Sequence, residues 1–295
     1  MISVNLKKVE PKHFPDGSQM LLDFKVYVDN PPYAVDIYWE YENDEECMTL
    51  YYLVNHVREH DPDAKIVLSM PYIPNARMDR VKDAKEVFTL KWFCKFINSL
   101  NFHTVTVLDP HSDVSAGMLD RVEIRSSWLN NMLNYAIQES MYDCDYDDFM
   151  VFFPDAGAMK RYKDFKAFKK VNMIYGQKKR DWSTGEILGF EIMDKDGHVI
   201  DPVVNPTWQD SPLKGKTILM VDDIISYGGT LYYSALKLKE LGAEHIFAYA
   251  SHTENSVLDE EKGKFKKCLD NGTVEKLFTT SSIYHGKHDS IEIIG

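Results

Sequence analysis

Two adjacent acids and a pair of glycines mark the segment best suited to chemistry. An apolar run ends at Asp222 and Asp223, and Gly228, Gly229 and Thr230 follow after a short loop. In an open parallel sheet, ligands bind beyond the carboxyl ends of strands, where loops lead into helices. Glycines let backbone N–H groups approach a phosphate, while carboxylates accept hydrogen bonds from hydroxyls or bind Mg²⁺. The pattern predicts a ligand such as ribose 5-phosphate; the alternative is a capped strand followed by an ordinary turn.

Short apolar runs alternate with longer amphipathic segments along most of the chain. This alternation is typical of a largely parallel sheet flanked by helices, and it predicts an α/β fold. In the first half, strands are predicted within 64–73 and 103–111, with a helix within 88–100 between them. The second half repeats this order of strands and helices within 149–157, 158–168, 216–223, 229–242 and 244–252.

The length of the chain suits two domains of ordinary size. It has 295 residues, of which 44% are hydrophobic, so each domain can bury a core. The acidic segment 141–148 has no periodicity and predicts a boundary that gives domains 1–144 and 145–295. The segment 193–215 is rich in Pro, Gly and Asp, and is predicted to be a long hairpin or loop between core elements.

Composition excludes several classes of protein. A net charge of -12 argues against a nucleic-acid binder, which would carry a basic stripe. The sequence has no stretch of about 18 apolar residues, so no membrane span is predicted. Residues 1–8 lack the apolar core of a signal peptide. The cysteines have no zinc-like spacing, so we expect reduced thiols in a cytoplasmic protein at Cys47, Cys94, Cys144 and Cys268.

The string VDDIISYGGT (221–230) resembles the phosphoribosyl pyrophosphate motif shared by type I phosphoribosyltransferases and ribose-phosphate pyrophosphokinases. Transferases usually lack a paired first domain, so the extent of the resemblance favours the pyrophosphokinase family. It implies two domains of type I phosphoribosyltransferase-like architecture, the first contributing to ATP binding and the second carrying the acceptor motif and catalytic loop. Five further segments resemble pyrophosphokinase motifs in the family's order, at 13–19, 72–80, 107–115, 153–161 and 176–187.

The resemblance implies a Mg²⁺-dependent transfer of the β,γ-diphosphoryl group of ATP to the 1-hydroxyl of ribose 5-phosphate, giving phosphoribosyl pyrophosphate and AMP. Such a transfer needs an acceptor in line with the β-phosphorus and positive charge around the phosphates. Lys178 and Arg180 match the lysine-x-arginine of the family's mobile catalytic loop, which would supply that charge and exclude water. Without the resemblance, this charged run would be interpreted as a solvated turn.

His111 and Asp155 match the positions that hold Mg²⁺ on the ATP phosphates in the family. His111 follows a strand of the first predicted domain and Asp155 a strand of the second, so a metal between them would tie the domains together. Each residue also has an ordinary structural interpretation. His111 alone would more often be a capping or core histidine, and Asp155 has the position of an N-cap for a helix beginning at Ala156.

Arg77 matches the family's ATP-contacting arginine. Phe14 and Asp16 match adenine-contacting residues that a neighbouring subunit contributes in the family, which implies a homo-oligomer; Phe14 could equally be a core residue. Two departures bear on this nucleotide site. Met78 replaces a usual glutamine and Ser18 a usual glutamate, so the adenine or triphosphate contacts are expected to differ.

The acceptor loop departs from the family at Ser226 and Tyr227, where an aspartate and a threonine are usual. Ser226 removes a negative charge beside the sugar, and Tyr227 adds a ring that could stack on a larger acceptor. ADP-ribose, which the resemblance implies for some phage-type members in NAD salvage, is the second candidate acceptor. The alternative is that Tyr227 points to solvent.

Two other classes of protein remain open. Some members of the family have lost catalysis and serve as regulatory subunits, and the two altered nucleotide-site positions fit that case. The charged residues matched above argue against it, because a regulatory subunit does not need them. A phosphoribosyltransferase would consume the activated sugar without ATP.

Overall fold

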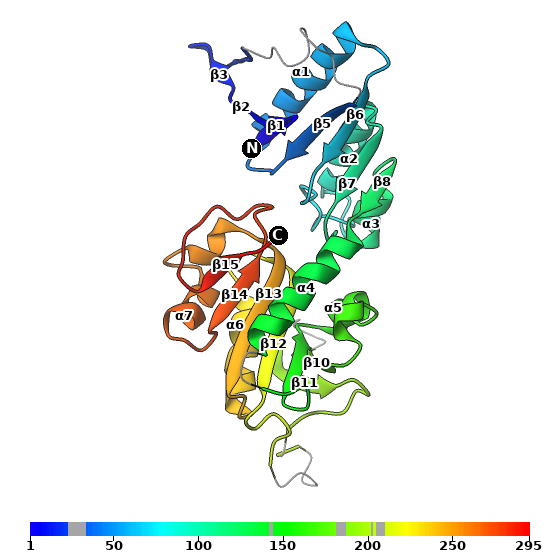
Figure 1. Ribbon diagram of the computed structural model, residues 1–295. Coiled ribbons are helices and arrows are strands. Elements are labelled where there is room, and N and C mark those ends of the chain that lie inside the picture. The colour runs from blue at the N-terminus through cyan, green and yellow to red at the C-terminus, as the bar shows by residue number, and fades with distance from the viewer. Residues whose placement is uncertain (23–33, 142–143, 181–186, 202, 205–209) are drawn as a thin grey trace. The chain divides into compact units, whose positions relative to one another are not determined.

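The computed structural model describes residues 1–22, 34–141, 144–180, 187–201, 203–204 and 210–295 (Figure 1). The side chains of 178–180 and 187–189 lie outside this description. By their contacts, the residues divide into two compact units, Met1–Ser126 and Ser127–Gly295.

The first unit is built on a six-stranded sheet in the order β2-β1-β5-β6-β7-β8. The four strands from β5 to β8 are parallel, whereas β1 is antiparallel to both of its neighbours. The sheet strands are β1 (Ile2–Val4), β2 (Lys7–Val9), β5 (Ala34–Trp39), β6 (Lys65–Ser69), β7 (Thr104–Val107) and β8 (Val122–Ile124). A separate hairpin consists of β3 (Lys12–His13) and β4 (Gln19–Met20).

Amphipathic helices connect the parallel strands of this sheet: α1 (Glu45–His60), α2 (Thr89–Ser99) and the short α3 (Asp113–Gly117). Helix α1 buries Leu50, Leu53 and Val57, which recur at helical spacing and therefore lie on one face. They join a core that includes Ile37 and Trp39 of β5. The helix thus has a buried face fixed to the sheet and an opposite face in solvent.

The second unit is built on a seven-stranded sheet in the order β11-β10-β9-β12-β13-β14-β15. All its neighbouring strands are parallel except β10 and β11, which form an antiparallel hairpin. The strands are β9 (Phe149–Phe153), β10 (Asn172–Arg180), β11 (Ile187–Asp194), β12 (Thr217–Ile225), β13 (His245–Thr253), β14 (Lys276–Thr279) and β15 (Ile291–Ile293).

The helices of the second unit begin with α4 (Ser126–Ser140), which lies across the sheet in Figure 1. The Tyr135 hydroxyl donates to Glu292 Oε1 at 2.6 Å, and its ring lies edge-on to Phe278 of β14. The division between the units therefore falls at Ser126/Ser127, whereas the sequence predicted it between residues 144 and 145. The other helical segments are α5 (Ala156–Tyr162), η1 (Lys166–Phe168), α6 (Gly229–Glu240), η2 (Asn255–Leu258) and α7 (Lys264–Asp270).

The helix predicted within 158–168 is broken in two. Helix α5 ends at Tyr162, and Phe165 has extended backbone angles before η1 begins. The break places the rings of Tyr162 and Phe168 against Phe153, one stacked and the other edge-on. Packing of aromatic side chains thus overrides the continuous helical pattern of the sequence.

The predicted 193–215 loop begins with a tight turn. Asp194 at the end of β11 accepts hydrogen bonds from the backbone N–H groups of Asp196 and His198, and Ile200 then bonds back to Ile192. Leu213 is buried in the core of the second unit, so the far end of the segment is anchored. Residues 202 and 205–209 lie outside the described part.

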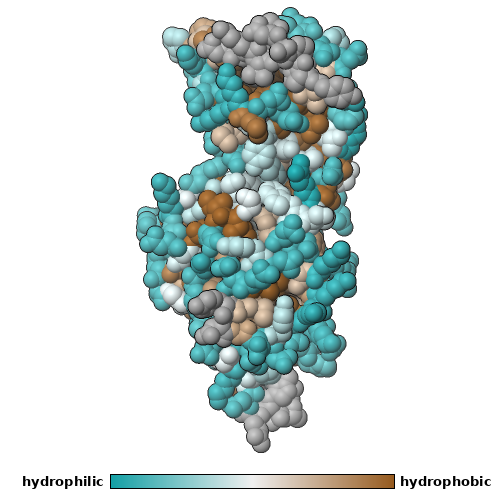
Figure 2. Space-filling view, in the orientation of Figure 1, coloured by the Kyte–Doolittle hydropathy of each residue, from teal (hydrophilic) through white to brown (hydrophobic). Residues whose placement is uncertain are grey.

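Polar side chains cover most of the face drawn in Figure 2, with separate apolar patches on each unit. This cover fits the acidic composition of the chain. In the part of the chain that the structure describes, no helix combines the length and apolarity needed to span a bilayer.

Candidate active site

Asp222 and Asp223 lie where strands β9 and β12 of the second unit part. The ladder between these strands ends at the pair Met220 and Phe152, and the two acids follow on β12. The sequence predicted that the acids end their strand, which is wrong, because β12 continues to Ile225 by pairing with β13. The acids therefore lie within a strand, but beyond the end of its neighbour β9.

Asp155 comes from β9 to the same edge of the sheet. Its Oδ1 accepts a hydrogen bond from the backbone N–H of Ala158 at 2.8 Å, so it caps helix α5, as one interpretation of the sequence predicted. Its carboxylate also acts electrostatically on Asp222, because its charge raises the pKa of Asp222. Capping and membership of an acidic site are thus compatible for this residue.

Burial and like charge act together on Asp222. Burial raises its pKa well above the usual value, and the carboxylates of Asp223 and Asp155 raise it further. The N–H of Asp223 donates to Asp222 Oδ1 at 3.0 Å, which opposes this shift only in part. Asp222 is thus a carboxylate whose ionised form is disfavoured by burial and by two neighbouring carboxylates, and a bound cation would stabilise that form.

Arg161 of α5 is a site residue that the sequence analysis missed. Its Nη1 lies 2.9 Å from Oδ1 of Asp223, whose side chain is buried, while the arginine side chain is 28% exposed. Because α5 begins at the Asp155 cap, one short helix supplies both the third carboxylate and the cation paired with Asp223. The arginine is six residues beyond Asp155, and only the fold shows that it reaches β12.

The loop after β12 makes a sharp turn at Gly228 into α6. Gly228 has φ +71°, in the left-handed region, and a Cβ at this position would lie 2.3 Å from Phe265 Cβ. Both the backbone angle and the space therefore require glycine. Gly228 is the N-cap of α6 and offers no side-chain cap, so backbone N–H groups at the start of the helix can serve a phosphate. Gly229 and Thr230 are the first residues of that helix.

A chain of hydroxyls connects Ser226 of this loop to a carboxylate. Ser226 Oγ lies 3.3 Å from Ser256 Oγ, and Ser256 Oγ donates to Glu254 Oε2 at 3.0 Å. The N–H of Glu254 donates to Ile225 O at 2.7 Å, which fixes the segment beside β12. Glu254 is thus linked through Ser256 to Ser226, the position at which the resembled motif usually has an aspartate. In the sequence, Glu254 and Ser256 belong to a polar run after the apolar strand β13. The sequence alone does not show that this run lies beside Ser226.

Tyr227 is 41% exposed, and Lys262 Nζ lies 5.9 Å from the centre of its ring. The ring therefore stands at the surface beside a cation, whereas its backbone O accepts a hydrogen bond from Phe265 N–H. This placement agrees with the interpretation that the ring points to solvent.

The backbone of the predicted catalytic residues Lys178 and Arg180 lies at the end of β10. There it pairs with β11, Lys178 opposite Phe190 and Arg180 opposite Ile187. Residues 181–186 and both predicted catalytic side chains lie outside the described part of the structure. Their role stays a prediction.

In the first unit, Arg77 and His111 follow the neighbouring parallel strands β6 and β7. Arg77 is exposed and His111 half-buried. The N–H of Leu108 donates to Pro71 O at 2.9 Å, so the two strand-end segments that lead to these residues are joined by a backbone hydrogen bond. The structure thus brings both predicted ATP-binding segments to one edge of their sheet.

Phe14 and Asp16 lie in the β3–β4 turn. Phe14 is 48% exposed, which excludes the core interpretation within this chain. Asp16 Oδ1 accepts from both the N–H and the hydroxyl of Ser18, and these bonds lower the pKa of Asp16. The serine that replaces the family's usual glutamate therefore organises the turn.

Helix α1 holds this hairpin in place. His13 pairs with Glu45, and Gln19 donates to the same carboxylate at 3.0 Å. Phe14 and Asp16 are therefore presented by a hairpin on α1, and not by the strand-end loops that carry Arg77 and His111. Their predicted contact with adenine in a neighbouring subunit stays a prediction.

The donor set of the second unit fits Mg²⁺. Asp155, Asp222 and Asp223 offer carboxylate oxygens, the ligand type that Mg²⁺ prefers. Burial, and then the charges of Asp223 and Asp155, raise the pKa of Asp222, and a bound divalent cation would favour its ionised form. The imidazole of His111 suits softer transition metals better, so its share in binding Mg²⁺ rests on the resemblance alone.

Comparison with known proteins identifies relatives by sequence. Among them are three ribose-phosphate pyrophosphokinases. That of Saccharolobus solfataricus is 26% identical over 254 residues, covering 85% of this chain and 78% of the relative. That of Pyrococcus furiosus is 25% identical over 248 residues (84% and 78%), and that of Vibrio cholerae 27% over 242 residues (81% and 68%). No protein-family model matches the sequence.

A solved structure, phosphoribosylpyrophosphate synthetase from Mycobacterium smegmatis, shares the fold. It superposes with a TM-score of 0.72 at 18% identity and covers 97% of this chain and 85% of that one. The fold is thus that of a two-unit α/β protein in which helices flank mainly parallel sheets, as predicted. The sequence relatives confirm the more particular resemblance, which is to the ribose-phosphate pyrophosphokinases.

Proposed function

We propose that this protein is an ATP-dependent diphosphotransferase of the ribose-phosphate pyrophosphokinase type. It would transfer the β,γ-diphosphoryl group of ATP to the 1-hydroxyl of ribose 5-phosphate, giving phosphoribosyl pyrophosphate and AMP. The observation that carries the proposal is the meeting of Asp155, Asp222 and Asp223 at one edge of a parallel sheet, next to the Gly228 turn that opens α6. The names of the relatives support the same activity.

The geometry suits an acceptor with two different ends. The ribose hydroxyls would donate to Asp222 and Asp223, while the 5-phosphate would accept from backbone N–H groups between Gly228 and Thr230. Arg161, paired with Asp223, would hold that carboxylate in place for the sugar. A sugar held at both ends has its 1-hydroxyl fixed in direction, which is what an in-line displacement requires.

In the reaction, a bond forms between the 1-oxygen and the β-phosphorus. The bond from that phosphorus to the oxygen bridging to the α-phosphorus breaks, AMP leaves with this oxygen, and the hydroxyl proton is released. Bound Mg²⁺ would neutralise phosphate charge, and we propose Asp155 and His111 as its protein ligands. Lys178 and Arg180 would add positive charge as AMP departs.

The ATP side of the proposal involves the first unit. Arg77 would contact the phosphates, and Phe14 and Asp16 would contact adenine in a neighbouring copy. An exposed aromatic ring on a hairpin held by α1 is suited to such a contact across a subunit border. We therefore expect a homo-oligomer.

The test is acceptor-dependent AMP formation. The protein is mixed with Mg²⁺, ATP and ribose 5-phosphate, and AMP is followed by chromatography. We expect AMP only when the acceptor is present, and weaker acceptor binding in Asp222→Asn and Asp223→Asn with little change for ATP. No AMP with any acceptor would favour a regulatory subunit, and release of pyrophosphate from phosphoribosyl pyrophosphate and a base would indicate a transferase.

A second acceptor, ADP-ribose, is favoured by one observation. Tyr227 presents an exposed ring beside Lys262, an arrangement that could stack a base and attract a second phosphate. If ADP-ribose is the acceptor, its product would be ADP-ribose pyrophosphate, a reaction of NAD salvage. Tyr227→Ala should then raise the KM for ADP-ribose several-fold and leave that for ribose 5-phosphate unchanged. Equal effects on both acceptors would remove the ring from recognition.

A further inference from the structure

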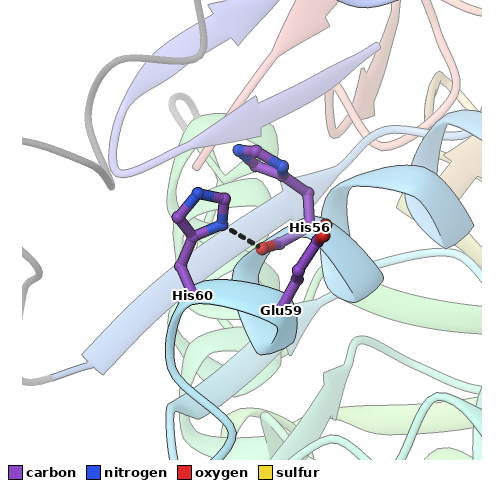
Figure 3. A group of neighbouring side chains, drawn as sticks. All are labelled: His56, Glu59 and His60. Carbon is purple, nitrogen blue, oxygen red and sulfur yellow. Dashed lines mark hydrogen bonds between the residues drawn. The ribbon is translucent and has the colours of Figure 1, made fainter.

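The last turn of α1 carries a group of metal-ligating side chains that the proposed reaction does not use. His56, Glu59 and His60 follow one another at positions i, i+3 and i+4, and one ligand atom from each lies within 4.8 Å of the others (Figure 3). Residues at this spacing are neighbours on one face of a helix. We propose that these three residues form a binding site for a divalent transition-metal ion, with Zn²⁺ the expected ion.

The donor set selects the kind of metal. Two imidazole nitrogens and one carboxylate oxygen are ligands that Zn²⁺ binds, and a pair of histidines at i and i+4 can bind one ion from a single helix. Mg²⁺ prefers oxygen ligands and keeps much of its water, so it would compete poorly here. This site therefore differs in chemistry from the carboxylate cluster of the second unit.

A hydrogen bond fixes the orientation of the His60 ring. His60 Nδ1 lies 2.9 Å from the backbone O of His56, and a carbonyl oxygen only accepts, so Nδ1 donates. The ring centres of the two histidines are 4.5 Å apart. Figure 3 shows the His60 ring turned back over the preceding turn, on the side where His56 and Glu59 lie. Histidines that bind metals commonly donate one ring N–H to a carbonyl in this way.

The position on the helix favours a cation. The group lies at the C-terminal end of α1, where the helix dipole is negative. The backbone there is anchored, because Val57 is buried in the core and Arg58 Nη2 donates to Asn101 O at 2.7 Å. The exposed side chains can adjust by rotation to close on an ion, while the helix that carries them stays fixed.

The site is open to solvent and supplies only some of the ligands that an ion needs. Glu59 and His60 are exposed and His56 is half-buried, so an ion enters directly from solvent. Three protein ligands leave the remaining coordination positions to water, as in zinc sites with an open position. The inference is independent of the proposed reaction, because none of the three residues has a part in it.

The test is calorimetric titration of the whole protein with ZnCl₂ in the presence of excess Mg²⁺, which occupies oxygen-only sites. We expect saturable binding of one zinc ion per chain. The double variant His56→Ala/His60→Ala should weaken this binding at least about tenfold, because removing even a residue that only supports a metal ligand costs about that much affinity. Glu59→Gln, which keeps the side-chain shape, should also weaken it. The matched control is His245→Ala, an exposed histidine of the second unit that pairs with Glu275 and should leave zinc affinity unchanged.

Several results would overturn the proposal. They are an absence of zinc binding by the wild-type protein, wild-type affinity in the double variant, or an equal loss in the His245→Ala control. Unfolding of the double variant would show as a lower melting temperature without zinc. In that case Glu59→Gln decides, and wild-type zinc affinity in a folded Glu59→Gln protein would remove the carboxylate from the site.

Discussion

Gly228 allows a sharp test of the acceptor loop, because its neighbour Gly229 is a matched control. In Gly228→Ala the new Cβ would lie 2.3 Å from Phe265 Cβ, on a residue with φ +71°. In Gly229→Ala the nearest neighbour of the new Cβ is Cδ of the flexible Lys264 side chain, at 3.9 Å, and the backbone is helical. The two changes add the same methyl group to adjacent residues.

The size of the effect follows from two costs. A non-glycine residue in the left-handed region costs about 1–2 kcal/mol. Carbon atoms pack at roughly 3.5 Å or more, so Phe265, which is fully buried, must move by about 1 Å, and overpacking of this kind costs about 1–3 kcal/mol. The sum is about 2–5 kcal/mol for Gly228→Ala. In Gly229→Ala both costs are absent, and alanine is the better helix former.

Differential scanning calorimetry of the protein without ligands measures this difference. For a unit of the size of Ser127–Gly295, the melting temperature should fall by roughly 4–20 °C in Gly228→Ala and not fall in Gly229→Ala. Gly228→Ala should also raise the KM for ribose 5-phosphate, because the turn that presents the N–H groups is displaced. Equal melting temperatures for the two variants would refute the account of this loop.

Three further changes test the charged residues. Asp222→Asn should raise the melting temperature of the Mg²⁺-free protein at neutral pH, because a raised pKa means that the ionised carboxylate destabilises the folded protein above the ordinary pKa of 3.8. The gain in melting temperature should shrink as the pH falls toward 3.8. A gain that does not depend on pH would contradict this account. Arg161→Met should lower the free energy of unfolding by about 2–4 kcal/mol, a value between those for exposed and for buried ion pairs. Adding Asp223→Asn should recover most of this loss. If calorimetry shows simply additive losses, the two residues are not coupled. Lys178→Ala should abolish AMP formation with an unchanged melting temperature, and AMP at the wild-type rate would remove the lysine from the mechanism.

Much of the fold could be predicted because hydrophobic periodicity is a local property. The predicted strands at 64–73, 103–111, 216–223 and 244–252 correspond to β6, β7, β12 and β13, although β12 and β13 extend to Ile225 and Thr253. What failed depends on partners distant in sequence. The pairing of β12 with β13 lengthened the strand, and the contacts of Tyr135 with β14 and β15 place α4 with the second unit.

The site shows the same division between local and long-range information. Asp222, Asp223 and Gly228 belong to one motif, so their shared position could be predicted. Arg161 and Glu254 reach that motif from other elements, through an ion pair and a chain of hydroxyls. A sequence does not show such contacts until the topology places the ends of β9, β12 and β13 side by side.

The central claim, attack of a sugar hydroxyl on the β-phosphorus of ATP, is tested most directly by ³¹P NMR of the complete reaction. The protein is incubated with Mg²⁺, ATP and ribose 5-phosphate, and the phosphorus resonances are followed until ATP is consumed. The account predicts AMP and a diphosphate attached to the 1-oxygen of the sugar, in equal amounts. ADP with a sugar monophosphate ester, or free pyrophosphate with an unchanged sugar, would contradict it.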